Sequence, residues 1–436
     1  MISVRDYGAR GDGTTDDTDA LQQAINDGGP VVLDRGDYLI SRPLVVELAD
    51  SGRLGISGGG VATLVMTGAG PALDIVGTHH GSASPSSFEP GVMEGQRMPS
   101  IAGLEILGAH GQADGVRLTC THAATLHALQ IRHCRHGVHL VERDRNLIVS
   151  DCHIYNNRGV GVFYDGVNIH QSNITGSHIS YNQGGGIKLL NAEVRNIQFT
   201  GNDIEYNFDL EADASADVWI DCQGTSIREG AITGNTIQAL PSPGGANVRI
   251  VGARADHPTA AGLLTVSGNL ISSQLTNVHI ADSRGVVVAG NQFFSGHEHA
   301  IHVERSDFIN IAGNNFGNNP DYRAETLDGI LIEDSGGCSV TGCIVENCLA
   351  GSAEEGGAID VRRSANLIVS ACQVHDPRWR ALHLCGVRRA LVAGCIVACS
   401  EPPTLNESVL LDGDCSEVEL SGNLLIEGER GTVVQD

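Results

Sequence analysis

The sequence predicts an all-β protein, a parallel β-helix of about 12–13 coils with a short capping helix at the N-terminus. Three observations lead to this fold class. A phrase containing Gly-Asn recurs through most of the 436 residues, short segments of alternating apolar residues accompany it, and the N-terminal residues follow a different pattern. Periods of 20–50 residues are typical of solenoids, in which each repeat packs on its neighbours.

The recurring phrase reads apolar-x-apolar-x-Gly-Asn-x-apolar. Successive copies begin 22 to 34 residues apart, and the looser copies have Ser or Cys in the Asn position. Stacked Asn side chains at a sharp turn can hydrogen-bond one another and the backbone along the axis, so we expect an asparagine ladder. The clearest copies are residues 197–204, 264–271, 286–293, 309–316 and 418–425.

A second phrase, Gly-Val-x-Leu, marks another strand in each coil. It occurs at residues 115–118 and 137–140, with related versions at 186–189, 217–220 and 300–303. Alternation with period two predicts strands that bury one face. Because no helical period lies between these strands, the coils are expected to be built from strands alone.

Residues 14–25 predict a short helix. Two threonines precede an acidic first turn, and Ala20, Leu21, Ala24 and Ile25 fall on one face. We expect this helix to cover the open N-terminal end of the solenoid.

Length alone would allow about three domains, but the repeat favours a single β-helix domain over residues 1–436. Residues 1–45 then form the N-terminal cap, and residues 101–436 form regular coils. The segment 78–100 is rich in Ser, Gly, Pro and His and lacks the repeat, so it predicts a long loop.

Charge and composition exclude several classes of partner. The chain has 27 Lys and Arg against 52 Asp and Glu, a formal net charge of −25. This balance argues against nucleic acid and against anionic membranes, which would be repelled. No run of 18 apolar residues exists and no apolar signal core follows Met1, so we expect a cytoplasmic protein, or a secreted one if the sequence is a trimmed form.

The 12 cysteines include no Cys-x-x-Cys pair, which argues against zinc ribbons and thioredoxin-like sites. Cys152, Cys343, Cys372 and Cys395 occupy the Asn position of the repeat. We therefore interpret most cysteines as small core residues of the stack, with disulfides or metal binding as the alternatives.

The N-terminal segment supplies a resemblance to a known superfamily. Residues 2–25, followed by Val31-Val-Leu and by Gly36-Asp-Tyr-Leu-Ile40, resemble the opening of the pectate-lyase-type right-handed parallel β-helix superfamily. That group includes polygalacturonase-like glycoside hydrolases and phage tailspike depolymerases. The resemblance covers about 40 residues and implies a single-stranded right-handed parallel β-helix, but the shared fold does not define a reaction.

The resemblance stops short of a catalytic motif. Polygalacturonases carry Asn-Thr-Asp, Asp-Asp, His-Gly and Arg-Ile-Lys motifs in order within their coils, and this sequence does not. Its Asp16-Asp17 pair lies in the capping segment. Candidate residues must therefore be chosen from the position of each residue in the coil.

The resemblance also implies that the strand after the variable turn, here the Gly-Val-x-Leu strand, lines a substrate groove. The first outward column comprises Arg117, His139, Phe163, Lys188, Trp219, Arg249, His279, His302, Leu331, Asp360, His383 and Leu410. The second comprises Thr119, Val141, Asp165, Leu190, Asp221, Val251, Ala281, Glu304, Glu333, Arg362, Cys385 and Asp412. Basic residues gather in the first column although the chain is acidic.

Asp165 and Asp221 are the leading catalytic candidates. They fall two coils apart, roughly 9.6 Å at ~4.8 Å per rung, near the upper end of the spacing of an inverting acid/base pair. Trp219 could stack on a sugar ring, while Lys188 and Arg249 could hold a carboxylated sugar.

Further candidates surround this pair. Asp203, Glu205 and Glu229 are alternative catalytic carboxylates. The substrate-binding candidates also include His279, His302 and Glu304, and Glu304 with Glu333 forms a second possible carboxylate pair.

No metal site is assigned and no cofactor is required. Calcium is an optional ligand of the acidic turn that holds Asp209, Glu211 and Asp213, although no EF-hand pattern is present. The run His297-Glu298-His299 lacks the spacing of a zinc-binding helix motif.

The leading hypothesis is a carbohydrate-active enzyme that cleaves or transfers a glycosidic bond, a glycoside hydrolase that uses carboxylate acid/base catalysis. The alternatives are a polysaccharide lyase acting on a uronate-containing glycan, an intramolecular transferase resembling inulin fructotransferases, and a non-catalytic glycan-binding or tailspike-like module. Side-by-side packing of β-helices also leaves a homotrimer open.

Overall fold

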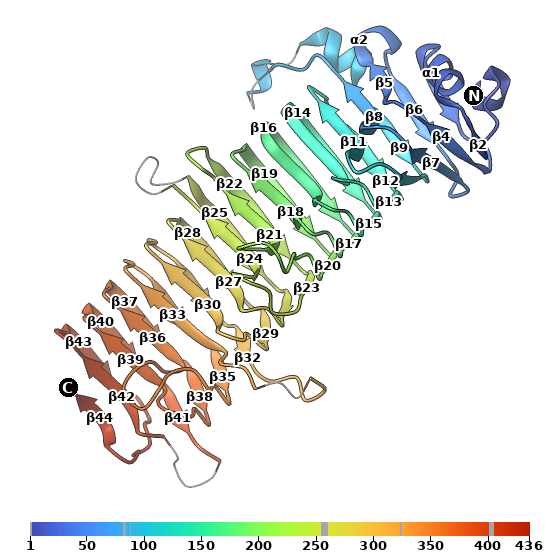
Figure 1. Cartoon of the computed structure of the whole chain (residues 1–436). Coiled ribbons are helices and arrows are strands. Elements are labelled where there is room, and N and C mark those ends of the chain that lie inside the picture. Colours follow the sequence, from blue (N-terminus) through green and yellow to red (C-terminus); the bar gives the residue numbers. More distant parts are fainter. Residues whose placement is uncertain (1, 82–83, 88, 254–259, 323–324, 401–404) are drawn as a thin grey trace. The chain divides into compact units, whose positions relative to one another are not determined.

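The computed structural model describes residues 2–81, 84–87, 89–253, 260–322, 325–400 and 405–436. Two compact units result: an N-terminal unit (Met1–Asp209 with Asp217–Gly230) and a C-terminal unit (Leu210–Ala216 with Ala231–Asp436). Each unit is a stack of parallel strands (Figure 1). About 54% of the chain is strand and 6% is helix, which confirms the all-β prediction.

Each regular coil contributes strands to three ladders, numbered here in the order in which the coil passes through them. In the N-terminal unit, ladder 1 contains β5 (Leu44–Glu47), β8 (Gly70–Val76), β11 (Ala113–Thr119), β14 (Val138–Ser150), β16 (Val160–Thr175), β18 (Gly185–Leu190) and β21 (Ala216–Asp221). Ladder 2 contains β1 (Ile2–Ser3), β3 (Gly29–Val32), β6 (Leu54–Ser57), β9 (Ser100–Ala102), β12 (Thr125–His127), the later parts of β14 and β16, and β19 (Glu193–Thr200). Ladder 3 contains β2 (Asp12–Asp16), β4 (Gly36–Ile40), β7 (Ala62–Met66), β10 (Glu105–Gly108), β13 (Gln130–Arg132), β15 (His153–Tyr155), β17 (His178–Ser180) and β20 (Asp203–Glu205).

The C-terminal unit repeats this arrangement, and β22 (Ile227–Thr233) spans the division between the units. Its ladder 1 contains β24 (Ala246–Val251), β27 (Thr276–Ala281), β30 (His299–Glu304), β33 (Gly329–Glu333), β36 (Ile359–Arg362), β39 (Leu382–Cys385), β42 (Glu407–Asp412) and β44 (Gly431–Gln435). Ladder 2 contains β25 (Ala261–Ser267), β28 (Arg284–Ala289), β31 (Asn310–Ala312), β34 (Ser339–Thr341), β37 (Ala365–Ser370), β40 (Arg388–Ala393) and β43 (Ser416–Ser421). Ladder 3 contains β23 (Thr236–Gln238), β26 (Leu270–Ser272), β29 (Gln292–Phe294), β32 (Asn315–Phe316), β35 (Ile344–Glu346), β38 (Gln373–His375) and β41 (Ile396–Ala398).

The chain makes about 16 turns, more than the 12–13 coils predicted. The difference arises in the first 100 residues, which lack the Gly-Asn phrase. Their strands nevertheless pair in register in the same ladders, as β4 does with β7 and β5 with β8. The repeat phrase therefore marks only the later coils, while strand alternation runs through nearly the whole chain.

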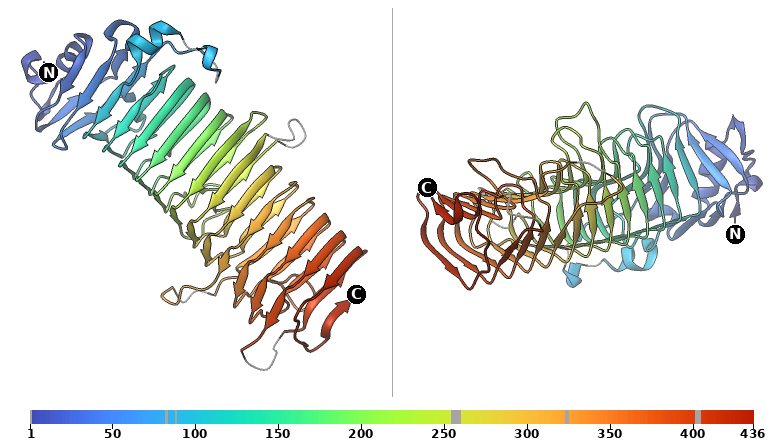
Figure 2. Two further views of the ribbon diagram at one scale, coloured as in Figure 1. Left: turned by 180° about the vertical axis from the view of Figure 1, so that it is seen from behind. Right: turned by 90° about the horizontal axis from the view of Figure 1, so that it is seen from below.

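The helical segments lie in the N-terminal unit, where Figure 2 shows them beside the first coils. They are η1 (Val4–Tyr7), α1 (Thr18–Asn26), α2 (Leu48–Ser51), η2 (Pro85–Ser87) and η3 (Val92–Gln96). The predicted helix 14–25 begins at Thr18 instead, because Asp12 accepts hydrogen bonds from the two preceding threonines and holds them in β2. Of the four residues expected on one face, Leu21, Ala24 and Ile25 are buried and Ala20 is half-buried.

The core consists of stacked aliphatic side chains. Along ladder 1 of the N-terminal unit, inward residues such as Val116, Val138, Val162 and Ile187 are fully buried. Burial of such side chains contributes about 1.5–3 kcal/mol each. The scarcity of aromatic residues follows, because successive rungs are only ~4.8 Å apart and similar aliphatic side chains stack at that spacing.

The predicted asparagine ladder is confirmed. In the C-terminal unit, Asn235, Asn269, Asn291 and Asn314 stack, and the side-chain oxygen of each later residue accepts the backbone N–H of the one before at 2.9 Å. A second stack in the N-terminal unit comprises Asn157, Asn182 and Asn207. These amides satisfy buried backbone groups at turns that the strand ladders leave unpaired.

The cysteine interpretation is also confirmed. Nine of the 12 cysteines are buried. Cys343, Cys372 and Cys395 continue the asparagine slot as unpaired thiols, and each sulfur lies within hydrogen-bonding reach of a backbone carbonyl.

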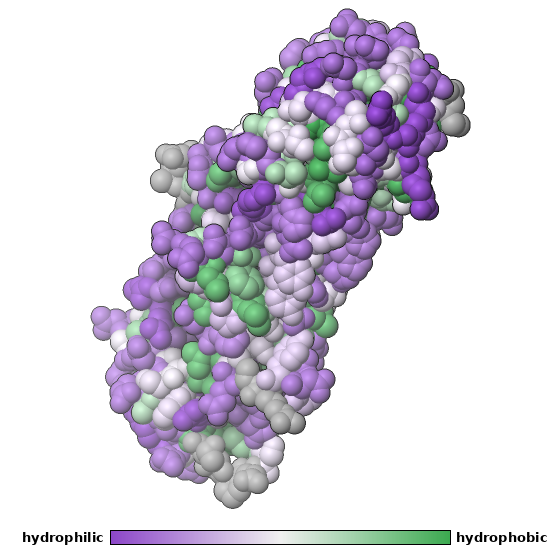
Figure 3. Space-filling model, turned by 45° about the vertical axis from the view of Figure 1, so that its right-hand side comes forward, coloured by the Kyte–Doolittle hydropathy of each residue, from purple (hydrophilic) through white to green (hydrophobic). Residues whose placement is uncertain are grey.

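The face of the protein drawn in Figure 3 is mostly polar. Hydrophilic residues predominate there, and apolar residues gather in small separate groups. Among the described residues, no helix is long and apolar enough to cross a membrane.

Asp144 is one of several buried carboxylates. Asp144 lies in β14, just beyond the register shift at which that strand passes from ladder 1 to ladder 2. One carboxylate oxygen accepts hydrogen bonds from the N–H and hydroxyl of Thr121, while the other is buried with no partner among the described residues. Burial raises the pKa of Asp144 to about 7.

The asparagine ladder should be a major source of stability. Asn291 accepts two hydrogen bonds from Asn269 and donates to Asn314 and to the carbonyl of Val266. Asn291→Ala leaves these buried groups unsatisfied, so we expect a loss of about 2–4 kcal/mol. Urea denaturation should measure it, with the exposed neighbour Gln292→Ala as control. Equal losses in both variants would refute this role for the ladder.

Asp144 should make folding stability fall as pH rises. Its folded pKa of about 7 exceeds the unfolded value of about 3.9, so the folded state binds more protons between these values. Stability from this group is therefore present at low pH and is lost by about pH 7. Asp144→Asn should flatten the pH dependence of the thermal midpoint over this interval. The exposed Asp151→Asn should keep the wild-type slope, and parallel curves for all three proteins would contradict the assignment.

Candidate functional site

The two predicted outward columns exist in both units. In the N-terminal unit the register pairs Arg117, His139, Phe163, Lys188 and Trp219 in sequence. The second column runs in parallel: Thr119, Val141, Asp165, Leu190 and Asp221. In the C-terminal unit the same pairing joins Arg249 to Leu410 and Val251 to Asp412 through the predicted members.

The structure brings the leading carboxylates onto one face. Asp165 pairs with Leu190, and Leu190 pairs with Asp221, so the two aspartates stand two rungs apart. At ~4.8 Å per rung this is roughly 9.6 Å between their strands. Asp165 is the more exposed of the two.

Asp165 belongs to a chain of polar contacts that the sequence did not predict. Its carboxylate lies 3.0 Å from Nε2 of the nearly buried His139. Nδ1 of His139 lies 4.0 Å from Asp114, whose carboxylate accepts a hydrogen bond from Nε of Arg135 at 2.8 Å. The Phe163 ring stacks on His139 at 5.4 Å between centroids, which holds the imidazole in place.

Within this chain of contacts, the negative charge of Asp114 is compensated by Arg135. Burial tends to raise the pKa of Asp114, yet the hydrogen bonds and charge of Arg135 outweigh burial and lower it. Burial also lowers the pKa of the neighbouring His136 to about 4, so that ring is neutral near pH 7. Arg117 is likewise paired, with Nε 2.9 Å from Asp74.

Lys188 and Trp219 are in direct contact. The Lys188 ammonium lies 3.8 Å from the centroid of the Trp219 ring, a cation–π arrangement. One face of the indole is therefore covered by the lysine. Burial lowers the pKa of Lys188, and the charge of Asp221 partly opposes that shift. Lys188 is the one lysine in the whole sequence, beside 26 arginines.

The other catalytic candidates lie elsewhere. Asp203 and Glu205 project from β20 on ladder 3, where Asp203 lies 3.1 Å from His178. Burial and the charge of Asp203 raise the pKa of Glu205. Glu229 is exposed on β22 in a left-handed backbone conformation. None of these three stands on ladder 1 with Asp165 and Asp221.

Three substrate-binding candidates of the C-terminal unit, His279, His302 and Glu304, contact one another or Glu333, and these four residues are called here the His–Glu network. His279 and His302 stack at 5.2 Å and contact Glu304 and Glu333, each at 3.0 Å. The second oxygens of these carboxylates pair with Arg305 and Arg363 respectively.

Arg249 joins the same network. Its guanidinium lies 3.0 Å from Nδ1 of His279. Burial and the positive charge of Arg249 lower the pKa of His279 to about 4. Each predicted substrate-binding residue of the C-terminal unit therefore already contacts another side chain of the protein.

Two clusters have a composition that could hold a metal ion. Among the described residues, His302, Glu304 and Glu333 form one, and His383, Cys385 and Asp412 form the other. Within each, the potential ligand atoms lie within 4.8 Å of one another. The acidic turn proposed for calcium lies at the division of the chain, with Asp209 in one unit and Glu211 and Asp213 in the other.

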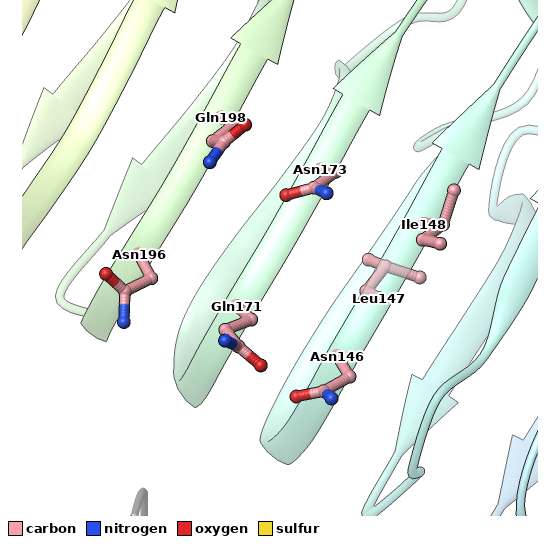
Figure 4. A pocket seen from close by; sticks show the side chains of 7 residues that line it. All are labelled: Asn146, Leu147, Ile148, Gln171, Asn173, Asn196 and Gln198. Atoms are coloured by element: carbon pink, nitrogen blue, oxygen red, sulfur yellow. The ribbon is translucent and has the colours of Figure 1, made fainter.

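A hollow of about 390 Å³ lies on ladder 2 of the N-terminal unit (Figure 4). Its polar lining consists of the side-chain amides of Asn146, Gln171, Asn173, Asn196 and Gln198. Three of them, Asn146, Gln171 and Asn196, adopt left-handed backbone conformations on successive rungs. Sequence reasoning missed this surface because such residues break the period-two alternation. The recurrence of amides about 25 residues apart was the available signal.

Family models match three parts of the chain. Residues 1–84 match a model described as rhamnogalacturonase A/epimerase, pectate lyase-like. Residues 100–237 match the right-handed beta helix region, and residues 231–385 match a model described as periplasmic copper-binding protein (NosD).

Curated relatives match only short segments. A glucan 1,3-beta-glucosidase of Cochliobolus carbonum is 45% identical over 58 residues. The pre-neck appendage protein of Bacillus phage phi29 is 49% identical over 41 residues, and alginate lyase 7 of Azotobacter vinelandii is 52% identical over 44. These segments are 9–10% of this chain and 5–7% of the relatives.

Solved structures resemble nearly the whole chain at low identity. The pre-mature gene product 12 of bacteriophage phi29 has a TM-score of 0.61 at 14% identity, covering 97% of this chain and 56% of that one. The A-module of the mannuronan C-5 epimerase AlgE4 of Azotobacter vinelandii has a TM-score of 0.51 at 14% identity, covering 96% and 100%. The Dettilon tailspike protein has a TM-score of 0.51 at 13% identity, covering 92% and 68%.

These findings define the class of protein. The ladders make the chain a parallel β-solenoid, and residues 100–237 match a model of the right-handed beta helix region. The chain has the pectate-lyase-like right-handed parallel β-helix fold, as its N-terminal residues predicted.

Proposed function

We propose that the protein is a carbohydrate-active enzyme that cleaves a glycosidic bond on the outer face of ladder 1 in the N-terminal unit. The observation that carries this proposal is the placement of Asp165 and Asp221 on one face, two rungs apart. Proteins whose names include a glucosidase, an alginate lyase and a mannuronan epimerase are among the similar proteins, which supports a glycan substrate.

The geometry suits an inverting hydrolase. A separation of roughly 9.6 Å leaves room for a sugar bond and an attacking water between the two carboxylates. Asp165, held by His139, would act as the base that activates water, because its contact with the imidazole fixes its position. Asp221 would donate a proton to the leaving oxygen, and Trp219 with Lys188 would border the bound sugar.

The amide hollow supports a glycan ligand independently of the reaction. Asn and Gln side chains offer both donors and acceptors, which match sugar hydroxyl groups. The residues that line it include no titratable side chain, so it could bind a glycan but would not supply acid/base chemistry.

Asp221→Asn should lower turnover by about 10²–10⁴-fold, the usual contribution of a general acid. New reducing ends, measured on a panel of polysaccharides and oligosaccharides, provide the readout. Asp203→Asn removes a carboxylate from ladder 3 and should leave turnover unchanged. Undiminished turnover in Asp221→Asn would refute the assignment, and glycan binding without turnover in the wild type would indicate a non-catalytic module.

A polysaccharide lyase is the second candidate, and Lys188 favours it. A desolvated lysine with a lowered pKa is a better base than an arginine, which stays protonated. In this reaction Lys188 takes the proton α to a uronate carboxylate. The electron pair forms a carbon–carbon double bond, and the glycosidic oxygen leaves with a proton from Asp221.

The two reactions differ in product. A lyase forms an unsaturated sugar that absorbs in the near ultraviolet, whereas a hydrolase adds water and forms none. If the lyase assignment is right, Lys188→Met should abolish the absorbance increase on uronate polymers. Lys188→Arg should show the same loss, because arginine stays protonated. New reducing ends without absorbance would exclude the lyase and support hydrolysis.

A further inference from the structure

Three ligand types meet on ladder 1 of the C-terminal unit. His383 and Cys385 are two residues apart on β39, so both project from the outer face, and the register pairs Cys385 with Asp412 on β42. The potential ligand atoms of these three residues lie within 4.8 Å of one another. This cluster is called here the His-Cys-Asp site.

The burial and the contacts of His383 suit a metal ligand. Its side chain is fully buried, and Nδ1 lies 2.8 Å from Oδ1 of Asp360 on the preceding rung. Asp360 also accepts a hydrogen bond from Nε of Arg362 at 2.9 Å. The backbone N–H of Gly356 also donates a hydrogen bond to Nδ1, at 3.0 Å, so Asp360 and Gly356 both lie at this nitrogen and neither contacts Nε2.

The other ring nitrogen, Nε2, faces Asp412 across the site. The Nε2 atom is buried and has no hydrogen-bond partner among the described residues. Its neighbour across the site is Oδ2 of Asp412, 3.7 Å away. Zinc–ligand bonds of about 2.0–2.3 Å place tetrahedral donors roughly 3.3–3.8 Å apart, so the spacing suits a shared ion.

The charges at this site also suit a divalent cation. Arg362 lies 2.7 Å from Asp360 and neutralises it. A Cys385 thiolate and the Asp412 carboxylate would then carry two negative charges that a divalent ion balances.

The His–Glu network provides the contrast. Its cluster has histidine and carboxylate groups at similar spacing, but both oxygens of Glu304 and of Glu333 already contact a histidine and an arginine. A metal there would have to displace both arginines. At the His-Cys-Asp site, the facing nitrogen has no hydrogen bond to lose.

We propose that the His-Cys-Asp site binds a divalent transition metal of the zinc type through Nε2 of His383, Sγ of Cys385 and a carboxylate oxygen of Asp412. Asp360 is a positioning residue that orients the imidazole, as carboxylates do behind metal-bound histidines. Three protein ligands leave one coordination position for water or an exogenous ligand. Mixed nitrogen, sulfur and oxygen donors favour zinc or cobalt over calcium and magnesium, which prefer oxygen alone.

Cobalt(II) and zinc(II) titrations of the full chain, kept reduced with a non-thiol reductant, test the proposal. The wild type should bind one equivalent of cobalt with a thiolate-to-cobalt charge-transfer band in the near ultraviolet, and zinc should displace it. Cys385→Ser should lose that band, and Asp412→Asn should bind more weakly. Cys399→Ser, which removes a half-buried thiol outside the site, should behave as wild type.

Two further variants separate this site from alternatives. Asp360→Asn should weaken cobalt binding by about 10–100-fold while keeping the charge-transfer band, as expected of a positioning residue. His302→Asn, in the His–Glu network, should leave cobalt binding and the charge-transfer band unchanged. Circular dichroism verifies folding of each variant. No cobalt or zinc binding by the wild type, or an unchanged band in Cys385→Ser, would overturn the proposal.

Discussion

In-register stacking of parallel rungs is the constraint on which the rest of this structure depends. Each rung must pair its backbone with the next, and the inward turns must satisfy amides that strands cannot reach. Stacked Asn side chains meet that need, as in the series from Asn235 to Asn314. This stacking places each outward position next to the equivalent position of the following rung, so outward residues form columns. The residues that share a column determine which side chains can act together.

The sequence predicted the columns well because they depend on only two periods. Alternation sets which residues point outward, and the coil repeat sets which residues become neighbours. Both columns, from Arg117 to Leu410 and from Thr119 to Asp412, were assigned correctly within each unit. The pairing of Asp165 with Asp221 across Leu190 followed from the same rule.

What the sequence could not provide was the direction of side chains and the local breaks in alternation. The contact of His139 with Asp165 depends on rotamers, as does the pairing of Arg117 with Asp74. The amide hollow depends on left-handed residues such as Gln171, which shift alternation locally. Asp203 and Glu205 are close to the leading candidates in sequence but project from ladder 3.

The solitary lysine has a practical consequence. Lys188 is the single side-chain amine in 436 residues, and it lies against Trp219. Reagents that acylate or alkylate amines can therefore address one rung of the solenoid, apart from the chain terminus. A probe attached there would report on that rung through quenching of the adjacent indole, which gives an optical signal from ladder 1 without any engineered label site.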